Sequence, residues 1–318
     1  MMNKIYKELR KNKAYRKFEG KIFELKGEDV EDILNPLIPK NIEFSDIDTC
    51  GFSFILTDKG TVYSEIVFYK LEDKYIIFSN EDLLSLFSDI KGEFSIKEVS
   101  DELSLIQIEG KESGEIAQQF YDYDISTLNF KFITNTTYKD SDIIMARFGY
   151  SGEFGYQFLL PNHLVPHFID EFLADTAQYD KELDDYVKFE VNHPVYDVYR
   201  GQYNLFELGY AWNLDFTKEE FKGRRGLLAD FESSTKQSIV FSASAEVQRD
   251  EGVYFDNQEI GKVYWVIKAL DEKTDRVCLG MLQVERYYAH SGLHFLTEGG
   301  VVLETLSNPY VIPESWSK

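Results

Sequence analysis

The chain has 318 residues, 43% hydrophobic and 15% aromatic, so it is expected to fold rather than to stay disordered. That length exceeds what one compact core accommodates and predicts two or three domains. The formal net charge of −22 argues against a nucleic-acid partner, which needs clustered Lys and Arg side chains, and disfavours binding to an anionic membrane surface.

The N-terminal stretch, residues 1–18, is basic and amphipathic and lacks the apolar core of a signal peptide. No run of apolar residues along the chain is long enough to span a bilayer. Cys50 and Cys278 are the two cysteines, and neither has metal-ligand spacing around it. These features predict buried thiols in a reducing compartment, no membrane partner and a cytoplasmic location.

The first third of the chain combines period-two alternation with short amphipathic runs. Its expected strands are bounded by glycine or by charged turns, and the first helix is expected to stop near Pro36. Strands are predicted at 20–27, 52–58, 60–71 and 74–80, and helices at 28–37 and 81–90.

A similar order then repeats loosely. Strands are predicted at 103–110, 130–138 and 142–150, and helices at 113–120 and 162–187. Units of this kind build α+β layers.

Residues 146–161 carry three glycines, Gly149, Gly152 and Gly155, directly before an alternating apolar strand. Glycine at such positions marks a positive φ or a close approach of two backbone segments. An ordinary turn needs one glycine, so this pattern indicates either a loop shaped to hold a ligand or an elaborate structural corner.

Beyond residue 232 the sequence changes to short β segments separated by polar turns, without a helical pattern. This pattern predicts an all-β barrel or sandwich of about 85 residues, joined through a linker at 231–236.

Several common motifs do not occur: the Walker A sequence, a GxGxxG between strand and helix, and GxSxG. His163 and His167 stand at helical spacing without the glutamate of an HExxH motif, so no metal site is expected.

Three segments together resemble the folate-binding aminomethyltransferase family, whose type member is the T-protein of the glycine cleavage system. The family's Arg-x-Gly-Tyr-Thr-Gly-Glu-x-Gly loop corresponds to residues 147–155. Its Leu-Glu-Ala-Gly-x-Pro-x-Tyr-Gly segment corresponds more loosely to residues 188–197, and its Gly-Leu-x-Trp … Phe-Ile-Gly-Arg segment to residues 209–227. Their order and spacing agree, and the resemblance covers essentially the whole chain.

The resemblance implies a three-module cloverleaf of the α+β class. Two interleaved α+β modules would occupy residues 1–232, and a C-terminal Greek-key β-barrel would occupy residues 233–318. A central hole between the modules would hold tetrahydrofolate as the cofactor.

The resemblance also assigns residues to that hole. Glu190 matches the pterin-binding glutamate, and a buried carboxylate suits the N–H donors of a reduced pterin. Asn80 matches a residue that orients the pterin, and a turn-forming asparagine is the alternative. Arg224 matches an arginine near the folate carboxylates. Tyr196 belongs to the second matched segment, and Tyr150 is expected to shape the pocket.

The sequence departs from the family at the catalytic position. T-proteins carry a Gly-Gly-x-x-Asp-Asp segment with a carboxylate beside folate N5, and the matching run here ends in Ser64 and Glu65. A serine cannot act as a carboxylate base at neutral pH, whereas Glu65 could substitute. Neighbours on a strand face opposite sides, so we expect Ser64 or Glu65, but not both, to face the folate.

Three interpretations follow. The first is a tetrahydrofolate-dependent one-carbon transferase that takes an aminomethyl or methyl group from a small-molecule or carrier-bound donor, which the sequence does not identify. The second is a non-catalytic folate-binding module, and the third is a folate-free scaffold for protein interactions. The sequence does not indicate an oligomeric state.

Overall fold

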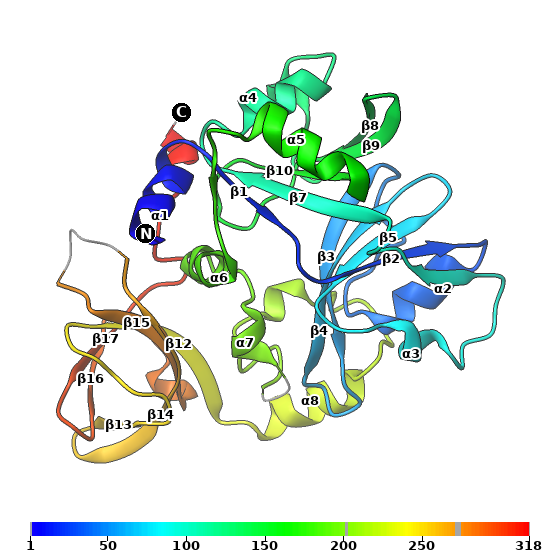
Figure 1. Cartoon of the computed structure of the whole chain (residues 1–318). Helices are drawn as coiled ribbons and strands as arrows, with labels where there is room; N and C mark the ends of the chain where they lie inside the picture. The colour runs from blue at the N-terminus through cyan, green and yellow to red at the C-terminus, as the bar shows by residue number, and fades with distance from the viewer. Residues whose placement is uncertain (1, 201–202, 271–274, 318) are drawn as a thin grey trace.

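A computed structural model describes residues 2–200, 203–270 and 275–317 of the chain. Figure 1 shows three parts: a six-stranded sheet, a five-stranded sheet and a separate closed barrel. Within the described ranges, no helix is both long and apolar enough to cross a membrane. Cys50 and Cys278 are buried free thiols, as predicted.

The six-stranded sheet has the order β11-β1-β7-β10-β9-β8. The long apolar strand β7 pairs antiparallel with β1 on one side and with β10 on the other. Helices α4 (Gly114–Ala117) and α5 (Val165–Phe172) pack against one face through Ile116 and Phe168. The strands are β11 (Ala177–Gln178), β1 (Ala14–Lys17), β7 (Leu103–Glu109), β10 (Gly155–Pro161), β9 (Ser141–Ala146) and β8 (Ile133–Tyr138).

The five-stranded sheet has the order β3-β4-β5-β2-β6 and is apolar on both faces. Alternation along β4 sends Ile66 toward the core under α2 (Val30–Leu34) and α3 (Leu84–Phe87). Its neighbour Val67 faces the central core of the molecule. The strands are β3 (Thr49–Leu56), β4 (Val62–Lys70), β5 (Tyr75–Ser79), β2 (Lys21–Lys26) and β6 (Ser95–Glu98).

The chain weaves between the two sheets. It starts with α1 (Met2–Lys11), places β1 in the six-stranded sheet, and then builds the whole five-stranded sheet before it returns with β7. This order confirms the prediction of two interleaved α+β modules.

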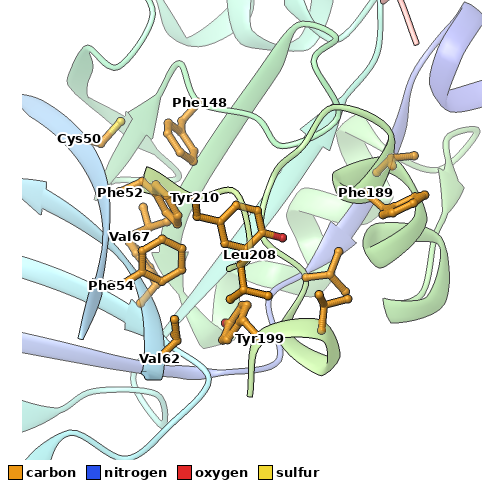
Figure 2. Close-up of a cluster of buried hydrophobic side chains, with 14 of the residues drawn as sticks. Cys50, Phe52, Phe54, Val62, Val67, Phe148, Phe189, Tyr199, Leu208 and Tyr210 are labelled. Atoms are coloured by element: carbon orange, nitrogen blue, oxygen red, sulfur yellow. The ribbon is translucent and has the colours of Figure 1, made fainter. Parts of the chain in front are cut away.

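Helices α6 (Lys181–Glu190) and α7 (Tyr196–Tyr199) occupy the middle of the molecule, between the sheets and the barrel (Figure 1). Figure 2 shows the aromatic core that forms where the segment after α7 meets the five-stranded sheet. The ring of Phe54 on β3 stacks on Tyr210 at 5.9 Å and meets Tyr199 edge-on at 6.0 Å. This packing fixes α7 over β3 and β4.

The C-terminal strands close into a barrel of order β12-β15-β14-β13-β16-β17, with β17 paired to β12. β13, β14 and β15 follow one another as neighbours while β12 lies beside β15, as a Greek key requires. The strands are β12 (Lys236–Ala243), β13 (Gly252–Phe255), β14 (Gln258–Lys268), β15 (Cys278–Glu285), β16 (His294–Thr297) and β17 (Val302–Thr305).

Two local predictions are wrong. The single helix expected at 162–187 is two helices, α5 and α6, because the chain between them pairs β11 with β1. The linker expected at 231–236 begins inside α8 (Arg224–Ser233). The domain boundary that we place between residues 232 and 233 therefore lies in the last turn of α8.

Candidate functional site

A cavity of about 260 Å³ lies between the two sheets and one face of α6. We refer to it as the α6 cavity. The side chains that carry its chemistry are Arg16 from β1, Glu65 from β4, Asn80 after β5, Gln107 from β7, Tyr150 from the glycine loop, Asp184 and Lys188 from α6, and Tyr196 from α7.

The structure brings four of the seven predicted site residues together at this cavity: Glu65, Asn80, Tyr150 and Tyr196. Ser64, Glu190 and Arg224 are not among the residues that line it. Their surroundings are described below.

Glu65 and Ser64 face opposite sides of the five-stranded sheet, as the alternation of β4 predicts. The Ser64 hydroxyl is buried and hydrogen-bonds the Ser79 hydroxyl at 2.8 Å. The Glu65 side chain is 7% exposed, and its Oε2 accepts from the Tyr199 hydroxyl at 3.4 Å. Burial raises the pKa of Glu65 from 4.5 to about 7, with Lys188 acting in the opposite direction. At neutral pH this carboxyl can therefore either give or take a proton.

Asp184 is the second buried carboxylate of the cavity, with its side chain 2% exposed. Its Oδ2 accepts from Lys188 Nζ at 3.0 Å and pairs with Arg16. Burial would raise the pKa of Asp184, but Lys188 and Arg16 outweigh it and hold the pKa below its usual value. The other oxygen, Oδ1, is buried and has no hydrogen-bond partner among the described residues.

The sequence-based prediction missed Asp184, Lys188 and Arg16. A signal was available in α6, where Lys181/Asp185 and Asp184/Lys188 form oppositely charged pairs at i, i+4. Apolar residues surround these charges on the same helix, and seven of its ten residues are buried. A charged pair within a buried helix indicates a site rather than a solvated face.

Lys188 and Tyr150 lie on one wall of the cavity, and His193, which does not line it, stacks on Tyr150. Lys188 Nζ lies 4.4 Å from the centre of the Tyr150 ring, and the Tyr150 and His193 rings stack at 4.8 Å. Burial and the nearby Lys188 lower the pKa of His193 to about 3, so this imidazole is neutral at physiological pH. His193 Nε2 is 3.7 Å from Glu65 Oε1, too long for a hydrogen bond, and a neutral imidazole forms no ion pair.

Glu190, at the end of α6, binds the N-terminal helix. Its Oε1 accepts from the Tyr6 hydroxyl at 2.8 Å, and its Oε2 pairs with the Arg10 guanidinium. Arg10 also pairs with Glu153 of the glycine loop at 3.0 Å. The carboxylate of Glu190 is therefore engaged in holding α1 against α6, and its role in pterin binding stays a prediction.

Arg224 begins α8, which packs on the turn between β3 and β4. A Cβ on Gly223, which has φ +80°, would lie 2.3 Å from the Thr57 carbonyl oxygen, and one on Gly226 would lie 2.4 Å from Lys59 C. The neighbouring Lys222 pairs with Asp58 at 2.9 Å. Close packing explains the glycines of this segment, and the contact of Arg224 with folate stays a prediction.

The glycine loop positions Tyr150 by backbone contacts. A Cβ on Gly155 would lie 2.5 Å from the Gly149 Cα, so these two glycines let the loop close on itself. The buried carboxylate of Glu109 accepts from the backbone N–H of Tyr150 at 3.0 Å and of Ser151 at 2.7 Å. The loop is both an elaborate corner and the support of a cavity residue.

Comparisons with known proteins agree with this architecture. Residues 18–218 match the family described as the GCVT N-terminal domain. An aminomethyltransferase of Thermoanaerobacter pseudethanolicus is 24% identical over 285 residues, which cover 84% of this chain and 77% of the relative. One from Listeria monocytogenes serotype 4b (strain F2365) is 24% identical over 252 residues, covering 75% and 70%.

A solved structure has the same fold along nearly the whole chain. The crystal structure of glycine cleavage system aminomethyltransferase T from Bartonella henselae superposes with a TM-score of 0.84. The superposition covers 98% of this chain and 90% of that one, at 15% sequence identity. The expectation of a cloverleaf with a C-terminal barrel is confirmed by this match.

Proposed function

Because this chain belongs to the GCVT N-terminal domain family, we propose that it is a tetrahydrofolate-dependent one-carbon transferase that binds the pterin in the α6 cavity. The observation that carries the proposal is the buried Asp184 Oδ1, which lacks a partner among the described residues and belongs to a cavity-lining carboxylate. A buried acceptor of this kind requires a donor, and the folate pterin presents N–H donors along one edge.

Asp184 would hold the pterin through a charge-assisted hydrogen bond. Lys188 and Arg16 lower its pKa, so it stays ionised and acts purely as an acceptor at neutral pH. Both cations bind Oδ2, which orients the carboxylate and leaves Oδ1 for the ligand. We therefore assign to Asp184 the role that the family resemblance gives to Glu190, whose oxygens already accept from Tyr6 and Arg10.

Glu65 would move the proton that one-carbon transfer requires. Tetrahydrofolate, when bound, supplies the nucleophilic nitrogen N5 that accepts the one-carbon unit. Glu65 has a pKa of about 7, whereas Asp184 remains ionised at that pH. Glu65 would therefore transfer the proton, and Asp184 would act only as a hydrogen-bond acceptor. The neutral His193 neither takes that proton at physiological pH nor fixes Glu65 as an ion pair.

The size and lining of the cavity suit the ring system rather than the whole cofactor. Its volume of about 260 Å³ is slightly below the roughly 300–1,000 Å³ of sites for drug-sized ligands, so the folate tail would lie outside it. Tyr150 and Tyr196 supply apolar ring surface, while Asn80 adds an amide that can both donate and accept.

Titration calorimetry with tetrahydrofolate tests the binding part directly. The wild-type chain is expected to bind one equivalent, with a heat at pH 7 that depends on the ionisation enthalpy of the buffer because the ligand changes the pKa of Glu65. Glu65→Gln should still bind but lose that buffer dependence. No binding by the wild type contradicts the proposal, and a buffer-independent heat contradicts the role of Glu65.

A transfer assay then separates an enzyme from a binding module. With an aminomethylated lipoyl carrier protein or a methylated amine as donor, Glu65→Gln should lower the transfer rate by about 10²-fold or more. Ser64→Ala should leave the rate within about twofold, because its hydroxyl faces Ser79 on the other side of the sheet. Folate binding without transfer from these donors would contradict the catalytic part of the proposal.

A further inference from the structure

A second cavity, of about 370 Å³, is lined by both members of the stacked Tyr150–His193 pair. Tyr150 lines both cavities, whereas the remaining lining residues of the two differ. We refer to it as the aromatic cavity. The folate proposal makes no use of it.

Its walls carry an arc of six rings, each in contact with the next. Trp212 stacks on Phe52 at 5.8 Å, and Phe52 meets His193 edge-on at 4.8 Å. Tyr150 follows His193, and it meets Phe148 at 5.3 Å. Phe148 stacks on Phe130 at 5.7 Å with the ring planes 9° apart. Figure 2 labels Phe52 and Phe148, the second and fifth rings of this arc.

The outer ends of the arc are exposed to solvent. Phe130 is 57% exposed and Trp212 is 56% exposed, although both line the cavity. Large exposed apolar side chains beside a cavity mark a surface that contacts a ligand or a partner. A flat aromatic ring can stack on such side chains without any movement of the core.

The charge of the aromatic cavity is opposite to that of the protein. The chain carries 56 Asp and Glu residues, yet none of the described residues that line this cavity is acidic. Two lysines line it, Lys40 and Lys131, and neither forms an ion pair with a described carboxylate. Burial and the proximity of Lys131 lower the pKa of Lys40. A bound anion would favour the protonated form of Lys40 and so counteract both effects.

We propose that the aromatic cavity binds an aromatic carboxylate, with its ring against the arc and its carboxylate at Lys40 and Lys131. The aromatic walls specify a flat apolar body, and the two lysines without acidic partners specify a negative end. Free aryl carboxylates and the benzoylglutamate tail of a folate share this chemistry. The proposal stands on the residues of this cavity and does not depend on pterin binding beside Asp184.

The test uses 4-phenylbutyrate and its neutral amide, 4-phenylbutyramide, titrated into the full chain by calorimetry and by tryptophan fluorescence. Trp212 fluorescence should respond to both probes, and the carboxylate should bind about tenfold or more tightly than the amide. The double variant Lys40→Gln/Lys131→Gln should bind the carboxylate only as tightly as the amide. Lys222→Gln, which alters a lysine paired with Asp58 outside this cavity, is the matched control.

Three results would overturn the proposal: no binding of 4-phenylbutyrate, equal affinity for the two probes, or an unchanged affinity in the double lysine variant. Trp212→Ala should weaken both probes and locates them at the arc. Competition with 4-aminobenzoylglutamate and with tetrahydrofolate then identifies the source of the carboxylate. Displacement by both supports a folate-tail site, and displacement by neither supports a site for a separate aryl carboxylate. Asp184→Asn should leave probe binding unchanged, so failure of the pterin site is distinguishable from failure of this one.

Discussion

Lys188 and Asp184 lie one helical turn apart on α6 and form a buried ion pair, with 3.0 Å between Lys188 Nζ and Asp184 Oδ2. The same ammonium group lies 4.4 Å from the centre of the Tyr150 ring. One lysine thus connects the ionised carboxylate of the α6 cavity to Tyr150, the ring that lines both cavities.

Lys188→Met should destabilise the protein by about 2 kcal/mol at pH 7, because Asp184 keeps Arg16 but loses its second cation. The pKa of Asp184 is lowered in the folded state, so the stabilisation is present above its unfolded value of 3.8 and is lost as the pH falls through the folded pKa. Urea unfolding at pH 7 and at pH 3 should therefore show a smaller effect in acid. Lys181→Met, which removes a half-exposed lysine from Asp185, is the control and should cost less. An equal loss of stability at both pH values would contradict the lowered pKa of Asp184.

Glu65→Gln should stabilise the protein in alkaline solution. The folded pKa of about 7 lies above the ordinary glutamate value of 4.5, so the wild type loses stability as the pH rises from 4.5 through 7. Glutamine carries no charge, and the variant should avoid a penalty on the order of 3 kcal/mol at pH 8, while matching the wild type at pH 4. The measurement is the difference in urea midpoint against pH. Glu24→Gln is the control of opposite sign: burial would raise the pKa of Glu24, but Lys26 and Lys74 outweigh it and lower the pKa.

Arg10→Met should cost about 3–5 kcal/mol of stability, because Glu153 and Glu190 would both lose a buried cation. Tetrahydrofolate affinity should stay within about twofold, since none of the three residues lines the α6 cavity. Lys13→Met removes a partly exposed lysine that pairs with Glu112 and Glu115, and it should cost no more than about 1 kcal/mol. If a folded Arg10→Met variant loses much of its folate affinity, the result would support Glu190, rather than Asp184, as the residue that binds the pterin.

Gly152→Ala and Gly209→Ala form a matched pair that tests the packing of the glycine loop. The two glycines have nearly equal φ values, +78° and +76°, so alanine strains both backbones by about 1–2 kcal/mol. At Gly152 the new Cβ would also lie 2.8 Å from Pro313 Cγ and 2.9 Å from Val191 Cγ1, whereas at Gly209 it meets nothing within 4 Å. Gly152→Ala should therefore be less stable by a further 1–3 kcal/mol or so in urea unfolding. Equal losses would mean that the loop can yield at this contact.

Much of the fold could be predicted from local patterns. The alternation in 20–27 and 74–80 corresponds to β2 and β5, which pair with each other, and the apolar run of β7 ends where the 103–110 prediction places it. The split between α5 and α6 could not be predicted, because it depends on β11 pairing with Ala14 and Tyr15 more than 150 residues earlier. Such a non-local pairing leaves no periodic signal.

The candidate site was predictable on the strands and less so on the helix. The period of a strand predicts that Ser64 and Glu65 face opposite sides of the sheet, while Asn80 was predicted from the family resemblance. Spacing could not show which of Glu190 and Asp184 is available to a ligand. The two residues lie on the same helix, and they differ in the cations that reach them from distant parts of the chain. Arg10 reaches Glu190 from α1, while Arg16 reaches Asp184 from β1. Charge partners that are distant in sequence determine which carboxylate remains available to a ligand.

Titration of tetrahydrofolate into Asp184→Asn and Glu190→Gln, side by side with the wild type, tests the central claim most directly. The account predicts that Asp184→Asn weakens binding at pH 7 by about tenfold or more, because it replaces an ionised acceptor with a neutral amide. Glu190→Gln should bind as the wild type does, although the loss of its pairing with Arg10 lowers the unfolding midpoint. If a folded Asp184→Asn variant retains its affinity while the Glu190→Gln variant loses binding, the assignment of pterin binding to Asp184 is contradicted.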